Sequence, residues 1–146
     1  MGYVFTFQDA ATYDRLLQTA DRRTYSQFES QLMLEMLRPE PGDTLLEVGC
    51  GTGASLLQLL EHRLQLTGID ASPYMLDFAR RHLGQRCELY RAQAEDLPFD
   101  DNAFNHTIFM TSLEFVDDPR QALAEACRVT KDRLFIGILN RFAIMG

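Results

Sequence analysis

The sequence is poor in cysteine, in clustered basic residues and in long apolar runs, and each shortage excludes a class of protein. Its three cysteines, Cys50, Cys87 and Cys127, lie far apart and form no Cys-x-x-Cys pair. This pattern argues against a disulfide framework and a zinc site, so we expect no metal and a reducing, cytoplasmic location. No apolar stretch approaches the ~18 residues of a membrane span. The amino terminus lacks the basic start and apolar run of a secretory signal.

Basic residues are outnumbered: 14 Lys and Arg stand against 21 Asp and Glu, a net charge of −7. The short pairs Arg22-Arg23 and Arg80-Arg81 sit among acids. Phosphate backbones and anionic lipids are bound by clustered Lys and Arg, so we expect neither nucleic acid nor a membrane as a partner. A chain of 146 residues, 46% of them hydrophobic, fits one domain with a core of its own.

What the sequence does contain is an alternation of strands and helices. Strands are predicted at Thr44–Val48, Gln65–Ile69, Cys87–Arg91, Phe104–Met110 and Arg133–Leu139. Helices are predicted near Asp9–Thr19 and at Ser26–Leu37, Gly53–His62, Pro73–Leu83 and Pro119–Val129. This alternation predicts an α/β fold, a doubly wound parallel sheet with helices on both faces. We expect a single domain in which an N-terminal helical segment (1–41) precedes a Rossmann-like core (42–146).

A glycine-rich turn follows the first strand, in the run Glu47-Val48-Gly49-Cys50-Gly51-Thr52-Gly53. Closely spaced glycines let a ligand approach bare backbone beside a helix N-terminus. Asp70 ends the second strand about 20 residues later, where an acid can accept hydrogen bonds from both hydroxyls of a ribose. The structural alternatives are a purely conformational loop and a turn role for Asp70.

Two further candidates follow the third and fourth strands. Asp96 and Leu97 can bind an exocyclic amine and cover a ring edge, or they form a solvated acidic turn. Met110 and the residues up to Phe115 line the space between cofactor and substrate, or they cap the core. All candidates lie at the carboxyl ends of strands, where such sheets bind ligands. The residues alone predict an adenosine-containing cofactor, because Gly49-x-Gly51-x-x-Ala54 also satisfies a dinucleotide fingerprint.

The segments LLEVGCGTG, GIDASPYML, AEDLPF and FMTSLEFVDDP, in this order, resemble the class I S-adenosylmethionine (AdoMet) dependent methyltransferases. The resemblance is to the small-molecule type, including ubiquinone and menaquinone biosynthesis enzymes, and runs from about Tyr13 to Asn140. It implies strand order 3-2-1-4-5 and AdoMet as cofactor. In the implied site, Gly49, Gly51 and Gly53 pack on the methionine part of AdoMet, and Glu47 orients its amino group. Asp70 holds the ribose, Ala71 lies near adenine, and Asp96 and Leu97 hold the adenine amine and ring edge. Met110 contacts the cofactor, and Tyr13 covers it.

The expected function is methyl transfer to a small-molecule acceptor by in-line displacement. Catalysis of this kind depends chiefly on positioning and desolvation, so we assign no catalytic residue. We expect His106, early in the fourth strand, to be structural. Two alternatives are a catalytically idle AdoMet-binding or interaction module and, less favoured, an NAD-binding oxidoreductase domain.

The carboxyl-terminal part departs from the family. Members continue after the fifth strand with another helix and two strands, which are absent from this sequence. The run Arg133–Leu139 is almost entirely apolar, as in a strand covered on both faces. An exposed apolar edge is a template for joining another chain. We therefore expect either a truncated form of a longer protein or a homodimer through the edge of the fifth strand.

Overall fold

The computed structural model describes residues 2–138, whose strands form one five-stranded parallel sheet of order β3-β2-β1-β4-β5. The strands are β1 (Thr44–Val48), β2 (Gln65–Asp70), β3 (Glu88–Arg91), β4 (Phe104–Met110) and β5 (Thr130–Gly137). β1 pairs with β2 on one side and with β4 on the other. The predicted strand order is therefore confirmed. The order of successive strands reverses between β1 and β4, and open sheets of this kind bind ligands at such a point.

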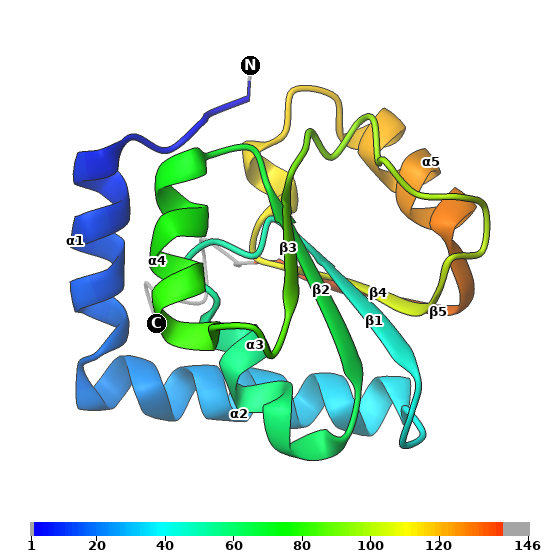
Figure 1. Ribbon diagram of the computed structural model, residues 1–146, viewed down its shortest axis with the longest axis horizontal. Helices are drawn as coiled ribbons and strands as arrows, with labels where there is room; N and C mark the ends of the chain where they lie inside the picture. The colour runs from blue at the N-terminus through cyan, green and yellow to red at the C-terminus, as the bar shows by residue number, and fades with distance from the viewer. Residues whose placement is uncertain (1, 139–146) are drawn as a thin grey trace, which may run out of the picture.

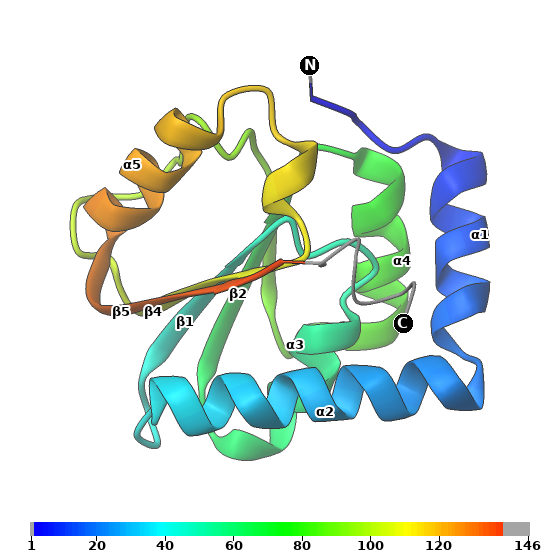
Figure 2. The same ribbon diagram turned by 180° about the vertical axis from the view of Figure 1, so that it is seen from behind.

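The helices cover both faces of the sheet (Figures 1 and 2). They are α1 (Phe7–Leu17), α2 (Ala20–Leu37), α3 (Ala54–Leu59), α4 (Pro73–Leu83) and α5 (Pro119–Val129), with short 3₁₀ turns η1 (Leu60–His62) and η2 (Leu113–Phe115). Buried side chains of α2, α3 and α4 form one core on one face, and those of α5 form a second core on the other. Successive strand residues point to opposite faces, so Leu45 enters the first core and Leu46 the second.

Two helix starts that fix the site follow directly from the sequence. Ser72 caps α4 by accepting a hydrogen bond from the Met75 amide, and Pro73 occupies the first turn. Asp118 caps α5 in the same way, followed by Pro119. Both arrangements satisfy amide groups that a helix N-terminus otherwise leaves without partners. These helices begin and end at the predicted residues.

The prediction for α2 was wrong at its start: the helix begins at Ala20 rather than Ser26. The apolar spacing that predicted it begins only at Phe28, and the first six residues of the helix carry no such pattern. Thr19 precedes the helix in an extended conformation. The whole N-terminal segment is thus more helical than the sequence indicates.

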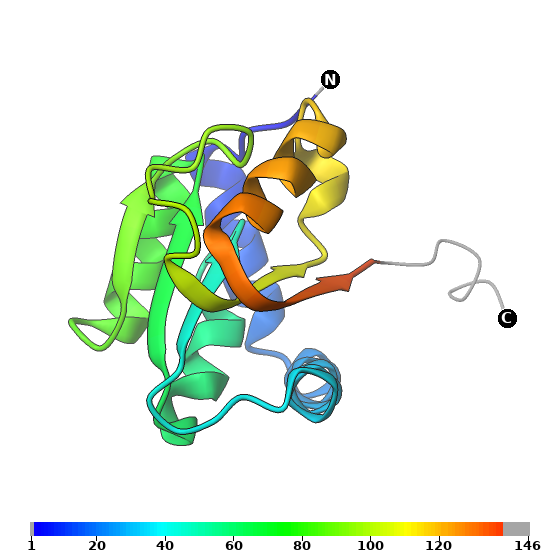
Figure 3. The same ribbon diagram turned by 90° about the vertical axis from the view of Figure 1, so that its right-hand side faces the viewer.

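The start of β5 also differs from the prediction, because α5 passes directly into this strand (Figure 3). The Thr130 hydroxyl donates to the carbonyl of Ala126 at 2.5 Å and lies 2.6 Å from the hydroxyl of Thr107, which joins the helix end to the sheet. Leu139, the predicted end, lies outside the described residues. No residue of β5 is fully buried, but Phe135 packs against the first core and Leu134 against the second, so both faces of this edge strand are partly covered.

Candidate functional site

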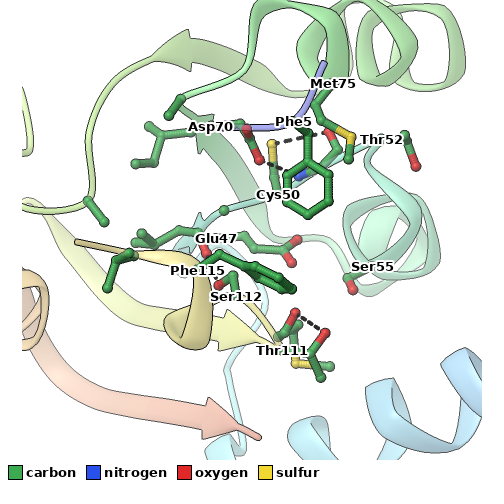
Figure 4. Close-up of a pocket in the computed structure, with 18 of the residues that line it drawn as sticks. Phe5, Glu47, Cys50, Thr52, Ser55, Asp70, Met75, Thr111, Ser112 and Phe115 are labelled. Atoms are coloured by element: carbon green, nitrogen blue, oxygen red, sulfur yellow. Dashed lines mark hydrogen bonds between the residues drawn. The ribbon is translucent and has the colours of Figure 1, made fainter. Parts of the chain in front are cut away.

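A cavity of about 350 Å³ opens at the carboxyl ends of β1, β2 and β4 (Figure 4). Its size is that of a site for a small molecule or cofactor. Its walls come from the loop after β1, the segments after β2, β3 and β4, the chain before α1, and the facing sides of α1 and α2. This is the edge of the sheet at which the sequence candidates gather.

The loop after β1 forms the floor of the cavity with two glycines in the left-handed region. Gly49 has φ +76°, and a Cβ there would lie 2.5 Å from the Cβ of Ser112. Ser112 in turn donates a 2.7 Å hydrogen bond to the Val48 carbonyl, so β1 and the segment after β4 touch at this point. Gly51 has φ +56°, and its Cβ would enter the cavity, 3.9 Å from Tyr13 and 4.0 Å from Met75. A side chain at either position would be strained.

Asp70 joins this loop to the start of α4. Its two carboxylate oxygens accept 2.9 Å hydrogen bonds, Oδ2 from the Gly51 amide and Oδ1 from the Ser72 amide. Burial raises the pKa of Asp70, and the two amide hydrogen bonds oppose this shift by stabilising the charged form. Asp70 lines the cavity with lone pairs still free to accept further hydrogen bonds.

Glu47 projects from β1 toward the cavity and is only 2% exposed (Figure 4). Its Oε1 has no hydrogen-bond partner among the described residues. Burial, followed by the charges of Asp70 and Glu29, holds the pKa of Glu47 well above its ordinary value. A buried carboxyl without a partner is unfavourable, so this position calls for a donor or a positive charge from a ligand.

The segment before α1 forms a wall that the sequence did not predict. The Tyr3 amide donates a 2.9 Å hydrogen bond to the Phe115 carbonyl, and the Ser72 hydroxyl donates to the Phe5 carbonyl at 2.6 Å. The Gly2 amide also donates to the Asp117 carboxylate. The rings of Phe5 and Phe115 meet edge to face at 5.2 Å. The sequence gives no signal for a wall here, because this segment has no regular structure and its partners are distant in the chain.

The opposite wall comes from α1 and α2. Tyr13, predicted from the resemblance to cover the cofactor, lines the cavity. Four residues of α2 join it, and the sequence prediction missed them: Arg22, Tyr25, Ser26 and Glu29. Their spacing of i, i+3, i+4 and i+7 places them on one face of the helix, and this spacing is the signal that could have identified them.

Six of the nine residues predicted to bind the cofactor line the cavity: Glu47, Gly49, Gly51, Asp70, Ala71 and Met110. Gly53, Asp96 and Leu97 do not. Gly53 packs against α4, and a Cβ there would lie 2.9 Å from Leu83. From the loop after β3, the cavity is lined by Ala92, Gln93, Ala94 and Glu95 instead.

Two side chains of α5 explain the position of Leu97. The Leu97 amide donates to Glu125 at 2.8 Å, and its carbonyl accepts from Arg128 at 3.0 Å. Leu97 is 3% exposed and packs into the core beside α5, whereas Asp96 is exposed to solvent. The loop is thus fixed to α5 at Leu97, two residues beyond the cavity wall.

The histidines lie away from the cavity wall. His106 is 3% exposed and lies 2.9 Å from Asp43, which precedes β1 at the amino end of the sheet. This position fits the structural role predicted for it. His82 lies 2.6 Å from Asp14 and connects α4 to α1.

The comparison with known families agrees with this geometry. The family described as a methyltransferase domain matches residues 46–135, from β1 into β5. The chain belongs to this methyltransferase family. The match contains the glycine loop, Asp70 and the segments after β3 and β4, so most of the cavity lies within the methyltransferase domain.

Individual relatives place the chain among the class I AdoMet-dependent methyltransferases. It is 36% identical over 107 residues to a phosphatidylethanolamine N-methyltransferase of Cereibacter sphaeroides, which covers 70% of this chain and 52% of the relative. It is 37% identical over 95 residues to a demethylmenaquinone methyltransferase of Clavibacter sepedonicus, covering 64% and 39%. A solved structure of an S-adenosyl-L-methionine-dependent methyltransferase from Methanococcus maripaludis has the same fold, with a TM-score of 0.80 at 20% identity over 94% of this chain and 66% of that chain.

This methyltransferase chain spans about half the length, or less, of the curated relatives it matches. Within residues 2–138, no helix is both long enough and apolar enough to cross a membrane.

Proposed function

We propose that the chain binds AdoMet along this cavity and transfers its methyl group to a small-molecule acceptor. The observation that carries the proposal is the buried carboxyl group of Glu47, whose Oε1 has no partner among the described residues. The ammonium group of the methionine part of AdoMet supplies both the donor and the positive charge that this carboxyl needs. The residues present therefore fit the cofactor that the family implies.

Other parts of AdoMet fit other parts of the wall. Asp70 keeps lone pairs for the ribose hydroxyls after accepting its two amide hydrogen bonds. Gly49 and Gly51 let the methionine part lie against the backbone, and Met110 borders the same space. Arg22 is the one Lys or Arg of the described cavity wall, and we assign it to the carboxylate of the methionine part.

We assign the adenine end to Ala71 and to the segment Gln93–Glu95, which line the cavity. This changes the role expected for Asp96 and Leu97. In the proposal, these two residues and Gly53 act on the site through packing, since all three lie outside the wall. Glu95 offers a carboxylate for the adenine amine.

AdoMet supplies a methyl group on a sulfonium, already activated for in-line displacement. The residues of this chain would contribute by holding the two reactants in line and by excluding water. Phe5 and Phe115, which meet over the cavity, serve the exclusion of water. The relatives are named for phosphatidylethanolamine N-methylation, demethylmenaquinone methylation and O-methylation. We therefore expect a small-molecule acceptor for this chain. The acceptor atom differs among these relatives.

Calorimetry with AdoMet, S-adenosylhomocysteine and NAD⁺ tests the cofactor, followed by transfer assays on amine, phenol and quinol acceptors. We expect both sulfur compounds to bind and NAD⁺ to give no heat. Binding of NAD⁺ alone would support the oxidoreductase alternative. Binding of AdoMet without transfer to any acceptor would support the idle module and contradict the proposed activity.

We further propose that the chain acts in the cytoplasm. Its substrate is a small molecule rather than nucleic acid or a membrane. We also propose that two copies of the chain associate through the outer edge of β5. The three cysteines are unpaired, as suits a reducing compartment. β5 pairs only with β4 among the described strands, and Ile136 on it is 37% exposed. Sedimentation at micromolar concentration tests the association, and a monomer would contradict it.

A further inference from the structure

The face of α2 that lines the cavity is only partly used by the proposed cofactor contacts. Of its four residues, Arg22 is assigned to the cofactor carboxylate, which leaves Tyr25, Ser26 and Glu29 without a role. They line the cavity from α2, whereas the residues assigned to adenine lie in the segments after β2 and β3. The proposed cofactor contacts therefore leave this part of the wall unassigned, and we consider it for a second reactant.

Glu29 is the charged group of this wall. Its carboxyl is partly buried, and no Lys, Arg or His of the described residues lies within salt-bridge distance of it. Burial raises the pKa of Glu29, while Tyr25 and the more distant charge of Arg22 oppose the shift. The charge of Glu29 also helps to raise the pKa of Glu47, so the two carboxyls share one electrostatic field. A field of this sign favours a positive charge between them.

Two tyrosines flank the same space. Tyr13 lines the cavity from α1. The charged groups whose electrostatic effect reaches its hydroxyl include Glu47, Arg22 and Glu29. Tyr25 lines it from α2, one turn before Glu29 on the same face. Aromatic rings attract cations through their faces, and a carboxylate beside two tyrosines is a combination that suits an ammonium group.

We propose that Glu29 and Tyr25 form the acceptor end of the cavity and select a small molecule that carries a basic amine. This inference rests on the proposed function, because it assigns to the acceptor the part of the wall that AdoMet leaves free. A neutral acceptor of the same shape would bury part of the Glu29 carboxylate without giving it a positively charged partner, and would bind more weakly.

The test uses the chain saturated with S-adenosylhomocysteine, which has no methyl group to transfer. Phenethylamine and 2-phenylethanol, which differ in charge but hardly in shape, are titrated by calorimetry. We expect phenethylamine to bind at least about tenfold more tightly, the usual scale for one charged hydrogen bond. Glu29→Gln should remove this difference. Glu35→Gln, which removes the same charge from an exposed position of α2 outside the cavity wall, should preserve it.

Each other outcome overturns the inference in a recognisable way. Equal binding of the two probes, binding of neither, or an unchanged preference in Glu29→Gln would contradict it while leaving cofactor binding intact. A loss of affinity for AdoMet but not for S-adenosylhomocysteine in Glu29→Gln would show that Glu29 serves the sulfonium instead. If the unmodified chain binds neither sulfur compound, the proposed function itself fails and this inference fails with it.

Discussion

The amide of Gly51 donates a 2.9 Å hydrogen bond to Oδ2 of Asp70, which ties the glycine loop after β1 to the end of β2. The other oxygen of Asp70 accepts from Ser72, the N-cap of α4. One carboxylate therefore orders the two loops that form adjacent walls of the cavity. Its contribution to ligand binding is both direct, through free lone pairs, and indirect, through the shape of the loops.

We expect Asp70→Ala to weaken AdoMet binding at least ~10-fold, since hydrogen bonds to a charged group contribute about 1.5–3 kcal/mol each. The affinity of Asp70→Asn for AdoMet should lie between those of the unmodified chain and Asp70→Ala, because Asn keeps one acceptor oxygen and loses the charge. Calorimetry measures both variants against Asp77→Ala, which removes a surface carboxylate of α4 paired only with Arg80. Unchanged affinity in a folded Asp70→Ala would remove the ribose assignment.

At Gly51, a side chain would combine backbone strain with loss of cavity space. Gly51→Val should therefore abolish AdoMet binding. Gly42→Val is the matched control, because Gly42 has φ +92° and a Cβ there would meet nothing within 4 Å. Left-handed backbone costs a side chain roughly 1–2 kcal/mol, so we expect both variants to melt earlier than the unmodified chain. If Gly51→Val is folded and binds AdoMet like Gly42→Val, the loop has only a structural role.

Glu47 predicts a specific dependence of stability on pH. Its pKa is higher in the folded chain than its ordinary value of 4.5, so the unfolded chain gives up this proton first as pH rises. The free energy of unfolding of the ligand-free chain should therefore fall as pH rises above about 4.5, until Glu47 ionises in the folded chain as well. Glu47→Gln should show a smaller fall, because only other groups with raised pKa values, such as Asp70 and Glu29, still contribute to it. The variant should also be more stable near neutral pH and bind AdoMet more weakly.

Chemical denaturation across pH, with Glu61→Gln as a control at an exposed position, measures this difference. Parallel pH profiles for Glu47→Gln and the unmodified chain would show that Glu47 is not the group responsible. Retained AdoMet affinity in the variant would separately contradict the assignment of the ammonium group.

Most of the sheet could be predicted from the sequence, and the reason is local. β1, β4, α4 and α5 have the predicted ends, and the starts of the two helices are marked by the capping residues Ser72 and Asp118 and by the prolines that follow them. The wall from Gly2 to Phe5 could not be predicted. Its hydrogen bonds to Phe115 and Ser72 join residues more than sixty positions apart, and no local pattern encodes them.

The loop after β3 shows the same limit at finer scale. The resemblance predicted a segment that borders the cavity, but whether Glu95 or its neighbours Asp96 and Leu97 line the cavity depends on how the backbone turns. That turn is set by Arg128 and Glu125, about thirty residues later on α5. Residue type alone could not reveal it.

The wall before α1 predicts a difference between two neighbouring phenylalanines. Phe5 lines the cavity and packs on Phe115, whereas Phe7 packs on Tyr74 and Phe78 outside it. Phe5→Ala should therefore speed the dissociation of S-adenosylhomocysteine several-fold, and Phe7→Ala should lower thermal stability without this effect. Stopped-flow displacement measures both rates. Equal rates in the two variants would mean that this segment does not retain the cofactor.

Thr111 predicts a conflict between stability and function. It lies directly after β4 on the cavity wall with φ +57°, a value that a β-branched residue rarely adopts. The Thr111 amide donates to the Gly137 carbonyl at 2.8 Å, and its hydroxyl donates to the Met110 carbonyl at 2.7 Å. These two hydrogen bonds, to the end of β5 and to β4, stabilise the strained backbone of Thr111. Strain of this kind costs about 1–3 kcal/mol and concentrates at functional sites.

Asn tolerates left-handed backbone, so Thr111→Asn should raise the melting temperature, by about 2–4 °C for each kcal/mol relieved in a domain of this size. It should also slow methyl transfer, because the Asn side chain is longer than that of Thr and its amide reaches further into the cavity beside Ser112. Arg63→Asn is the control: Arg63 has φ +57° at an exposed position away from the cavity, so the substitution can relieve strain without changing transfer. A Thr111→Asn chain that is more stable and equally active would show that the strained backbone at Thr111 serves packing between β4 and β5 rather than the reaction.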